Sequence, residues 1–152
     1  VTTIVMGTSD LAKDLRVSPL GDRTGLNYAL GAVVLAARTE GLDIIDGVHL
    51  ALDDDAGFRA ACQQGRELGF DGKSLIHPRQ IAAANTAFGV TQTAANHARE
   101  IVNAWEQAAA ANEGVTVVRG QLVEQLHVDE AHRILELHEQ MLSKSAAEDA
   151  AD

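Results

Sequence analysis

The sequence is poor in the residues that crosslink a protein or anchor it in a membrane. Its single cysteine is Cys62, so no disulfide can form within the chain, which fits a reducing compartment such as the cytoplasm. Cys62 falls in a stretch with helical periodicity, and this favours a small buried side chain over a reactive nucleophile. No apolar run approaches the roughly 20 residues of a membrane span, and no secretory signal is visible. We therefore expect a cytoplasmic protein with no membrane partner.

Basic residues are also scarce, with 12 Lys and Arg against 22 Asp and Glu and a net charge of −10. This balance argues against a nucleic-acid partner, because non-specific binding needs a basic face. It still permits an anionic ligand, since a few placed cations or a helix N-terminus can hold one. Aromatic residues make up 3% of the chain, so the core must be built from Ala, Val, Leu and Ile.

Three apolar runs alternate with amphipathic segments, a pattern that predicts strands and helices in turn. The expected strands are residues 1–6, 42–50 and 70–76, and the expected helices are residues 9–16, 24–40, 53–69 and the segment after Pro78. Thr24 is expected to cap a helix, and Gly41 and Gly69 are expected to end helices. Alternation over short loops indicates parallel βαβ units.

Such units occur in open doubly wound sheets and in (β/α)8 barrels. No strand is followed by Gly-x-Gly-x-x-Gly, so a dinucleotide-binding sheet lacks its fingerprint. A complete barrel takes about 250 residues. We therefore expect an α/β fold in which residues 1–90 form a partial (β/α)8 TIM-type barrel, namely its last three βα units. Because the chain starts at Val1 without Met, directly in a strand, we also expect residues upstream.

Residues 91–152 are expected to form a C-terminal helical extension that packs on a neighbouring subunit. The apolar periodicity of two segments favours helices, and a short β-branched run with a glycine favours a strand and a turn. The expected elements are an Ala-rich helix from a cap at Thr91 to near Asn112, a strand at residues 115–118, a turn at Gly120 and a helix from His127 to about Lys144.

The first candidate site directly follows the first expected strand, at the end where barrels keep their catalytic groups. It consists of Gly7, Thr8, Ser9 and Asp10. Gly7 lets a ligand approach the backbone, and successive backbone N–H groups there could hold a carboxylate. Asp10 offers a hard oxygen ligand suited to Mg²⁺, although it could also simply cap the turn.

Four segments together resemble the citrate lyase beta-subunit-like and malyl-CoA lyase family, within the aldolase and citrate lyase superfamily. They are GTSDLAKDL, AARTEGLDIIDGVHL, GRELGFDGKSLIHPRQI and RGQLVEQLHVDEAHRIL, and they cover most of residues 3–142. Any one of these segments alone is weak evidence for the family, whereas their occurrence together in this order is specific to it. The resemblance implies the C-terminal half of a (β/α)8 barrel that assembles as a homotrimer or a multiple of it.

The resemblance also implies a divalent metal site. In this family Mg²⁺ is held by one Glu and one Asp, and the substrates are thioesters of hydroxy acids with coenzyme A or a carrier. Asp10 matches the metal-binding Asp. The Glu, and an early Arg that grips the substrate, belong to earlier strands and are not in this sequence. Gly7, Thr8 and Ser9 are then expected to bind the substrate.

Three further positions are candidates: Asp46 because it lies at the end of an expected strand, and Lys73 and His77 because the resemblance supports their segment as lying near the coenzyme A cleft. Asp46 could contact substrate, brace the metal site or be a hydrogen-bonded structural residue. Lys73 could meet a phosphate of coenzyme A or stabilise the barrel rim, and His77 could lie at the coenzyme A cleft or cap its helix. We expect Asp46 among the substrate-binding residues, and Lys73 and His77 among those that bind coenzyme A.

Many family members carry Asp-Gly-Lys-Met-Ile-Asp where this sequence runs from Arg119 to Glu124. The last acid of that motif projects into a neighbouring subunit's site, which implies that Glu124 is the catalytic acid/base. Arg119 and Gln121 depart from the common pattern. The segment VEQLHVDEAHR nevertheless resembles the malyl-CoA lyase and thioesterase-like branch. The alternative for Glu124 is a solvated turn residue.

The activity implied is that of a Mg²⁺-dependent carbon–carbon lyase. It would cleave a β-hydroxyacyl-CoA thioester such as (S)-malyl-CoA to acetyl-CoA and glyoxylate by retro-Claisen chemistry. The hydroxyl must lose a proton, which bound Mg²⁺ favours, and Glu124 would exchange a proton with the acetyl methyl group. The alternatives are an (S)-malyl-CoA thioesterase, a citrate lyase beta subunit, and a non-catalytic barrel fragment with a structural role.

Overall fold

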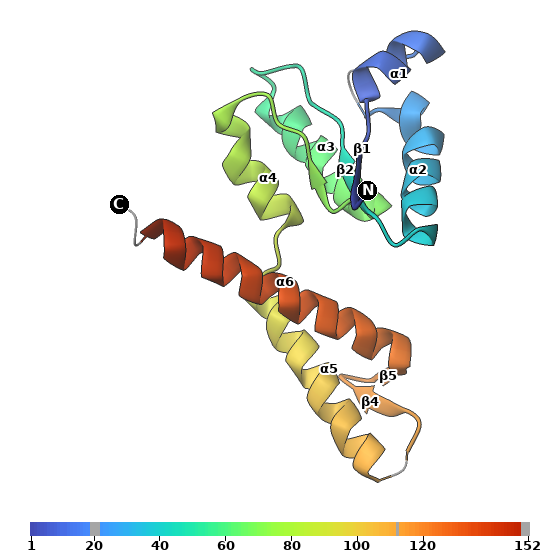
Figure 1. Ribbon diagram of the computed structural model, residues 1–152, viewed down its shortest axis with the longest axis vertical. Helices are drawn as coiled ribbons and strands as arrows, with labels where there is room; N and C mark the ends of the chain where they lie inside the picture. The colour runs from blue at the N-terminus through green and yellow to red at the C-terminus, as the bar shows by residue number, and fades with distance from the viewer. Residues whose placement is uncertain (19–21, 112, 150–152) are drawn as a thin grey trace. The chain divides into compact units, whose positions relative to one another are not determined.

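The computed structural model describes residues 1–18, 22–111 and 113–149, and it divides into two compact units, Val1–Phe88 and Gly89–Asp152 (Figure 1). Each unit has its own apolar core, and each is described by itself. None of the helices in these described ranges combines the length and the hydrophobicity that a bilayer span requires.

The first unit is a parallel sheet with helical connections. The strands are β1 (Thr3–Val5), β2 (Asp43–Asp46) and β3 (Gly72–Lys73), in the order β1-β2-β3. The helical segments are α1 (Thr8–Leu15), the 3₁₀ turn η1 (Thr24–Leu26), α2 (Asn27–Thr39), α3 (Asp55–Leu68), the 3₁₀ turn η2 (Pro78–Gln80) and α4 (Ile81–Phe88). The predicted α/β class with parallel βα units is confirmed. The sheet is small and open, so the partial barrel stays a prediction.

The strands are shorter than the apolar runs that predicted them. β2 ends at Asp46 because the N–H of Gly47 donates to the side chain of Asp46 over 2.8 Å instead of continuing the ladder. β3 spans only Gly72 and Lys73, and the N–H of Ser74 makes the last bond, to the carbonyl of Asp46 over 2.8 Å. All three strands therefore stop at one edge, where their loops begin.

The core of this unit lies between the sheet and α2. Ile44 of β2 is fully buried, and it packs with Leu30, Val34 and Ala37 on one face of α2. Alternation along a strand places Val5 on the opposite face, where 60% of it is exposed. The sheet is thus covered on one face and open on the other within this unit.

Helix ends follow the predicted signals in most places. Gly41 and Gly69 have φ of +64° and +97°, the left-handed conformation that glycine adopts at least cost. The predicted cap at Thr24 is wrong. A 3₁₀ turn precedes α2 there without a side-chain cap, and the N–H of Thr24 itself donates to Oδ1 of Asp22 over 3.1 Å.

The second unit is a helical hairpin with a small antiparallel sheet. Its elements are α5 (Gln92–Ala110), β4 (Thr116–Val118), β5 (Gln121–Val123) and α6 (Gln125–Asp149). Figure 1 shows the two strands near the end of α5 and the start of α6. Val118, Val123 and Val128 form the core, against Ile101 and Trp105 of α5.

Sequence patterns predicted this unit with some errors. Thr91 caps α5 as expected, since its hydroxyl accepts from the N–H of Ala94 over 3.1 Å. The predicted helix end near Asn112 falls on a residue outside those described. β5 was not predicted, because it is short and its partner strand defines it. The hairpin turn places Arg119 and Gly120 at φ of +51° and +80°, as a two-residue type I′ turn requires.

Candidate functional site

The carboxyl ends of the three strands lie at one edge of the sheet, and the loops that follow them meet there. The N–H of Met6, just after β1, donates to the carbonyl of Ile45 over 2.9 Å. A Cβ atom at Gly47 would lie 2.1 Å from Oγ1 of Thr8 and 2.8 Å from the carbonyl oxygen of Met6. Only glycine fits this contact, which holds the turn after β1 against the end of β2.

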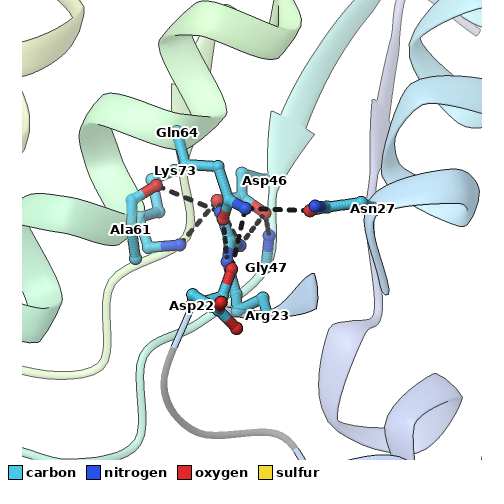
Figure 2. A network of polar contacts seen from close by, with 8 residues as sticks. All are labelled: Asp22, Arg23, Asn27, Asp46, Gly47, Ala61, Gln64 and Lys73. Atoms are coloured by element: carbon cyan, nitrogen blue, oxygen red, sulfur yellow. Dashed lines mark hydrogen bonds and ion pairs between the residues drawn. The ribbon is translucent and has the colours of Figure 1, made fainter. Parts of the chain in front are cut away.

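A buried ion network lies directly beneath this edge (Figure 2). Asp46 is 0% exposed, and both of its oxygens accept from Nη1 of Arg23 over 2.8 Å. Nζ of Lys73 donates to Oδ2 of Asp46 over 2.6 Å. Two cations therefore surround one carboxylate, and the network carries a net positive charge.

Arg23 joins this network to α3. Its Nε donates to Oε1 of Gln64 over 2.8 Å, and its Nη2 donates to the carbonyl of Ala61 over 3.1 Å. Gln64 in turn donates to the carbonyl of Asp22 and to Oδ1 of Asn27, both over 2.8 Å. These bonds bring the segment before α2, the end of β2 and the middle of α3 to one place, as Figure 2 shows.

Burial shifts the pKa values of two side chains at this network, Lys73 and Cys62. It lowers the pKa of the Lys73 ammonium, while the charge of Asp46 acts in the opposite direction. It raises the pKa of the thiol of Cys62, which is 0% exposed. The prediction that Cys62 is a small buried side chain is confirmed, because a buried thiol with a raised pKa is a poor nucleophile.

Sequence reasoning did not single out His49, which follows β2 at the same edge. Its ring stands edge-on to that of Phe58, with centroids 5.8 Å apart and planes at 64°. Burial lowers the pKa of its imidazole, against the attraction of Asp54 and with the help of the charges on Lys73 and Arg23. Its place shortly after Asp46, the last residue of β2, was the available signal.

Two cavities open at this edge. The smaller measures ≈ 10 Å³, and its lining mixes the polar residues Thr8, Ser9, Arg23, His49 and Lys73 with apolar side chains such as Leu26 and Val48. The larger measures ≈ 280 Å³ and lies between the loop after β2 and the loop after β3. Its lining includes Asp54, Asp55, Phe58, Arg59, His77 and Arg79.

The predicted substrate-binding residues fall at these cavities. Thr8 is buried and Ser9 is half-buried, and both line the smaller cavity, while Gly7 is exposed beside them. Asp46 is fully enclosed, and this geometry favours the bracing role over direct contact with substrate. The assignment of these four residues to substrate binding stays a prediction.

The two residues predicted to bind coenzyme A are placed differently. The side chain of Lys73 is 0% exposed and held by Asp46, which favours a structural role at the rim. His77 lines the larger cavity, and its Nδ1 also accepts from the N–H of Arg79 over 3.2 Å, which caps η2. Both interpretations of His77 are therefore compatible with its position.

Asp10 and Glu124 are both exposed. Asp10 lies in the first turn of α1, close in sequence to the loop contacts at Thr8. Glu124 lies in the second unit, just before α6, where its N–H donates to Nδ1 of His127 over 3.0 Å. No contact of either carboxylate reveals a role, so both assignments stay predictions.

Asp10 fits Mg²⁺ as one ligand of a site that needs more donors. Mg²⁺ usually binds through one or two carboxylates together with waters and substrate oxygens. Among the described residues, no group of three or more His, Cys, Asp or Glu could hold a metal ion. A metal at Asp10 would therefore be completed by water, by substrate oxygens or by donors from outside the described part of the chain.

The α/β fold of the first unit also occurs in solved structures. The chain is similar to the CitE protein of Mycobacterium tuberculosis, solved in complex with magnesium, acetoacetate and coenzyme A. The TM-score is 0.67 with 25% identity, over 88% of this chain and 51% of that one. The sequence model of the HpcH/HpaI aldolase/citrate lyase family matches residues 1–78. The chain belongs to this family, as the sequence motifs predicted.

Two curated relatives from Cereibacter sphaeroides are similar to most of the chain. A (3S)-malyl-CoA thioesterase is 45% identical over 89% of this chain and 47% of its own length. An L-malyl-CoA/beta-methylmalyl-CoA lyase is 41% identical over 72% of this chain and 34% of its own length. The chain spans about half the length, or less, of the curated relatives it matches. Family members of both names act on CoA thioesters.

Proposed function

We propose that this chain forms part of a Mg²⁺-dependent enzyme that acts on a β-hydroxyacyl-CoA thioester such as (S)-malyl-CoA. The observation that carries the proposal is the position of GTSDLAKDL directly after β1: its Thr8 and Ser9 line the smaller cavity, and the exposed Asp10 follows them in the first turn of α1. The relatives named for malyl-CoA chemistry support the substrate class.

The larger cavity is the proposed place for the coenzyme A phosphates. Arg59, Arg79 and His77 line it, and guanidinium groups suit phosphate oxygens well. The carboxylates of Asp54 and Asp55 share the lining, so the site is not uniformly basic. The proposal is supported by the magnesium and coenzyme A in the similar CitE structure.

For carbon–carbon cleavage, the hydroxyl of malyl-CoA loses its proton, the bond between the carbinol carbon and its methylene neighbour breaks, and the thioester enolate takes up a proton. Mg²⁺ bound at Asp10 would supply Lewis-acid stabilisation of the substrate oxygens. Thr8 and Ser9 are proposed to hold the substrate carboxylate, and Glu124 of a neighbouring subunit is proposed to return the proton to carbon.

Hydrolysis of the same thioester is a second candidate, favoured by the 45% identity to a (3S)-malyl-CoA thioesterase. In this reaction water attacks the thioester carbonyl and releases malate and coenzyme A. Both reactions start from one substrate, so their products separate them: glyoxylate with acetyl-CoA marks cleavage, and malate with free coenzyme A marks hydrolysis.

The partial barrel and the assembly belong to the same proposal. Val5 is 60% exposed on the open face of a parallel sheet, and such sheets normally have both faces covered. In the second unit, Val117, Leu122 and Leu126 are 63%, 55% and 64% exposed, which suits a surface that packs on a neighbouring subunit. Sedimentation of the whole protein tests the assembly, and a monomer would contradict it.

The test of the metal site is Asp10→Ala in the whole protein, with Asp14→Ala on the same helix as the matched control. We expect Asp10→Ala to abolish Mg²⁺-dependent turnover of (S)-malyl-CoA and to weaken Mg²⁺ binding. Asp14→Ala should retain both. Unchanged turnover with normal Mg²⁺ affinity in Asp10→Ala would refute the assignment and favour a non-catalytic role for this edge.

A further inference from the structure

Gln80, at the end of η2, is a buried polar residue to which the proposed reaction gives no role. It is 6% exposed, and it lines the larger cavity. Its backbone N–H donates to the carbonyl of His77 over 3.0 Å, and Pro78 begins the 3₁₀ turn with its fixed φ, so the base of the side chain is held in place. A buried amide needs hydrogen-bond partners, and those of Gln80 lie on two different loops.

Both ends of this side-chain amide have a partner. Oε1 accepts from the N–H of Ile76 over 3.1 Å, and Nε2 donates to the carbonyl of His49 over 3.2 Å. A backbone N–H can only donate and a carbonyl can only accept, so these two partners fix the orientation of the amide. Ile76 belongs to the loop after β3, and His49 belongs to the loop after β2. One side chain therefore joins the two loops.

The larger cavity lies between the same two loops. The loop after β2 supplies Leu52 and Asp54 to its lining, and the segment after β3 supplies His77 and Arg79. The spacing of these two walls depends on how the loops are held against each other. The bond from Nε2 of Gln80 holds them, because it connects positions 31 residues apart.

Arg79, the neighbour of Gln80, reaches the loop after β2 less firmly. Its Nη2 lies 3.5 Å from the carbonyl oxygen of Leu52 and 3.7 Å from Oδ1 of Asp53, and the side chains of Arg79 and Asp53 are 61% and 101% exposed. An exposed ion pair of this length contributes little to stability. Arg79 can therefore turn to a phosphate, while the buried amide of Gln80 keeps the loop in place.

A local capping role would account for only one of the two bonds. In a capping box, a Gln at the third helical position accepts from the N–H of the N-cap residue, and the bond from Ile76 to Oε1 resembles it, one residue earlier. The bond from Nε2 to the carbonyl of His49 crosses to another loop and adds nothing to the turn itself. The donor half of the amide is thus the part that acts on the cavity.

We propose that Gln80 is a positioning residue for coenzyme A binding, because its amide holds the two walls of the larger cavity at the spacing that coenzyme A requires. The inference rests on the proposed function and concerns its coenzyme A subsite. Gln80 acts through the loops and exchanges no proton with the substrate. Its loss should therefore raise KM for a coenzyme A thioester much more than it lowers kcat.

The test compares Gln80→Met and Gln80→Glu with Gln63→Met, which changes an exposed glutamine of α3, in the whole protein. Met removes both hydrogen bonds at similar volume, whereas an ionised Glu keeps the acceptor for Ile76 and loses the donor to His49. We expect both Gln80 variants to raise KM for (S)-malyl-CoA about tenfold with little change in kcat, since one lost hydrogen bond has an effect of this order on an equilibrium. Gln63→Met should match wild type.

A second substrate separates positioning from a general distortion of the fold. The (S)-malyl thioester of N-acetylcysteamine carries the same acyl group but has no nucleotide and no phosphate. Its KM should change far less than that of (S)-malyl-CoA in both Gln80 variants. A distorted site would instead impair the two thioesters alike.

Several outcomes would overturn the inference while the proposed function stands. They are an unchanged KM for (S)-malyl-CoA in both Gln80 variants, an equal loss with the two thioesters, and a rise of KM in Gln80→Met alone, which would mean that the local bond to Ile76 suffices. Wild-type protein that neither binds coenzyme A nor turns over (S)-malyl-CoA would overturn the proposed function as well.

Hydrogen exchange of the wild-type protein needs no variant, and it decides the question even where neither Gln80 variant folds. The N–H of Ile76 donates to Gln80, so it reports whether this link between the loops is closed. We expect saturating coenzyme A to slow exchange at this N–H, because a ligand that needs the closed link stabilises it. An unchanged exchange rate in the coenzyme A complex would refute the positioning role.

Discussion

The carboxylate of Asp46 receives hydrogen bonds from Arg23, Lys73 and the N–H of Gly47, and it meets no solvent. Burial of two cations is tolerable only because this anion lies between them, since an unpaired buried charge is far more costly than a paired one. Asp46 thus connects the end of β2 to β3 and to the segment before α2. Of the roles considered for Asp46, this geometry favours the bracing one, while its place among the substrate-binding residues stays a prediction.

Replacement of Asp46 tests this interpretation at the scale of one residue. Asp46→Asn keeps the shape but leaves Arg23 and Lys73 without their anion, and we expect a loss of about 3–5 kcal/mol in the free energy of unfolding. Asp43→Asn on the same strand is exposed and should change it by less than about 0.5 kcal/mol. Urea unfolding measures both, and equal stabilities would contradict a buried ion network.

At the scale of elements, the close contact between the turn after β1 and the end of β2 depends on a glycine. We expect Gly47→Ala to destabilise the first unit by about 2–3 kcal/mol, because its Cβ would press on the backbone oxygen of Met6, 2.8 Å away, which cannot move freely. Gly31→Ala on α2 is the matched control, since no atom lies within 4 Å of its Cβ. That change should stabilise α2 by about 0.5–1 kcal/mol. Thermal unfolding of the two variants should therefore shift in opposite directions.

The β4–β5 turn is tied to α5 by an exposed ion pair. Nε and Nη2 of Arg119 each donate to Glu100 over 2.8 Å, and this lowers the pKa of the Glu100 carboxyl below its ordinary 4.5. A lowered carboxyl pKa adds stability above that value and loses it as the pH falls through the folded-state pKa.

We therefore expect Glu100→Gln to reduce the urea midpoint at neutral pH and to make no difference well below pH 4.5. High salt should shrink the effect, because both side chains are exposed. Glu106→Gln, exposed on the same helix, serves as the control and should match wild type at every pH. A pH-independent effect of Glu100→Gln would show that packing rather than charge holds the turn.

At the scale of the whole molecule, the proposed coenzyme A site predicts that binding depends on the positive charges of the larger cavity. We expect Arg59→Ala and Arg79→Ala each to weaken coenzyme A binding by about tenfold, since hydrogen bonds to charged groups are worth roughly 1.5–3 kcal/mol. The wild-type affinity should fall with added salt. Arg99→Ala in the second unit is the control. Calorimetric titration of the whole protein measures all three, and unchanged affinity in both cavity variants would move the phosphate site elsewhere.

Local signals predicted most of the elements because their causes are local. Gly41, Gly69 and Thr91 act through backbone conformation and short-range capping, which sequence neighbours determine. The strand ends were less predictable. β2 stops at Asp46 because its carboxylate turns back onto the N–H of Gly47, a competition that apolar patterning does not reveal.

The sequence by itself determined the α/β class, the order of all strands and helices except β5, the family and the candidate Asp10. These follow from apolar periodicity, turn residues and motifs that each lie within a short stretch of chain. Only the tertiary structure decided that Arg23 and Lys73, 23 and 27 residues from Asp46, enclose it, and that His49 lies beside a water-sized cavity. Burial and ion pairing depend on which distant segments meet, and the packing of the strand-end loops determines that.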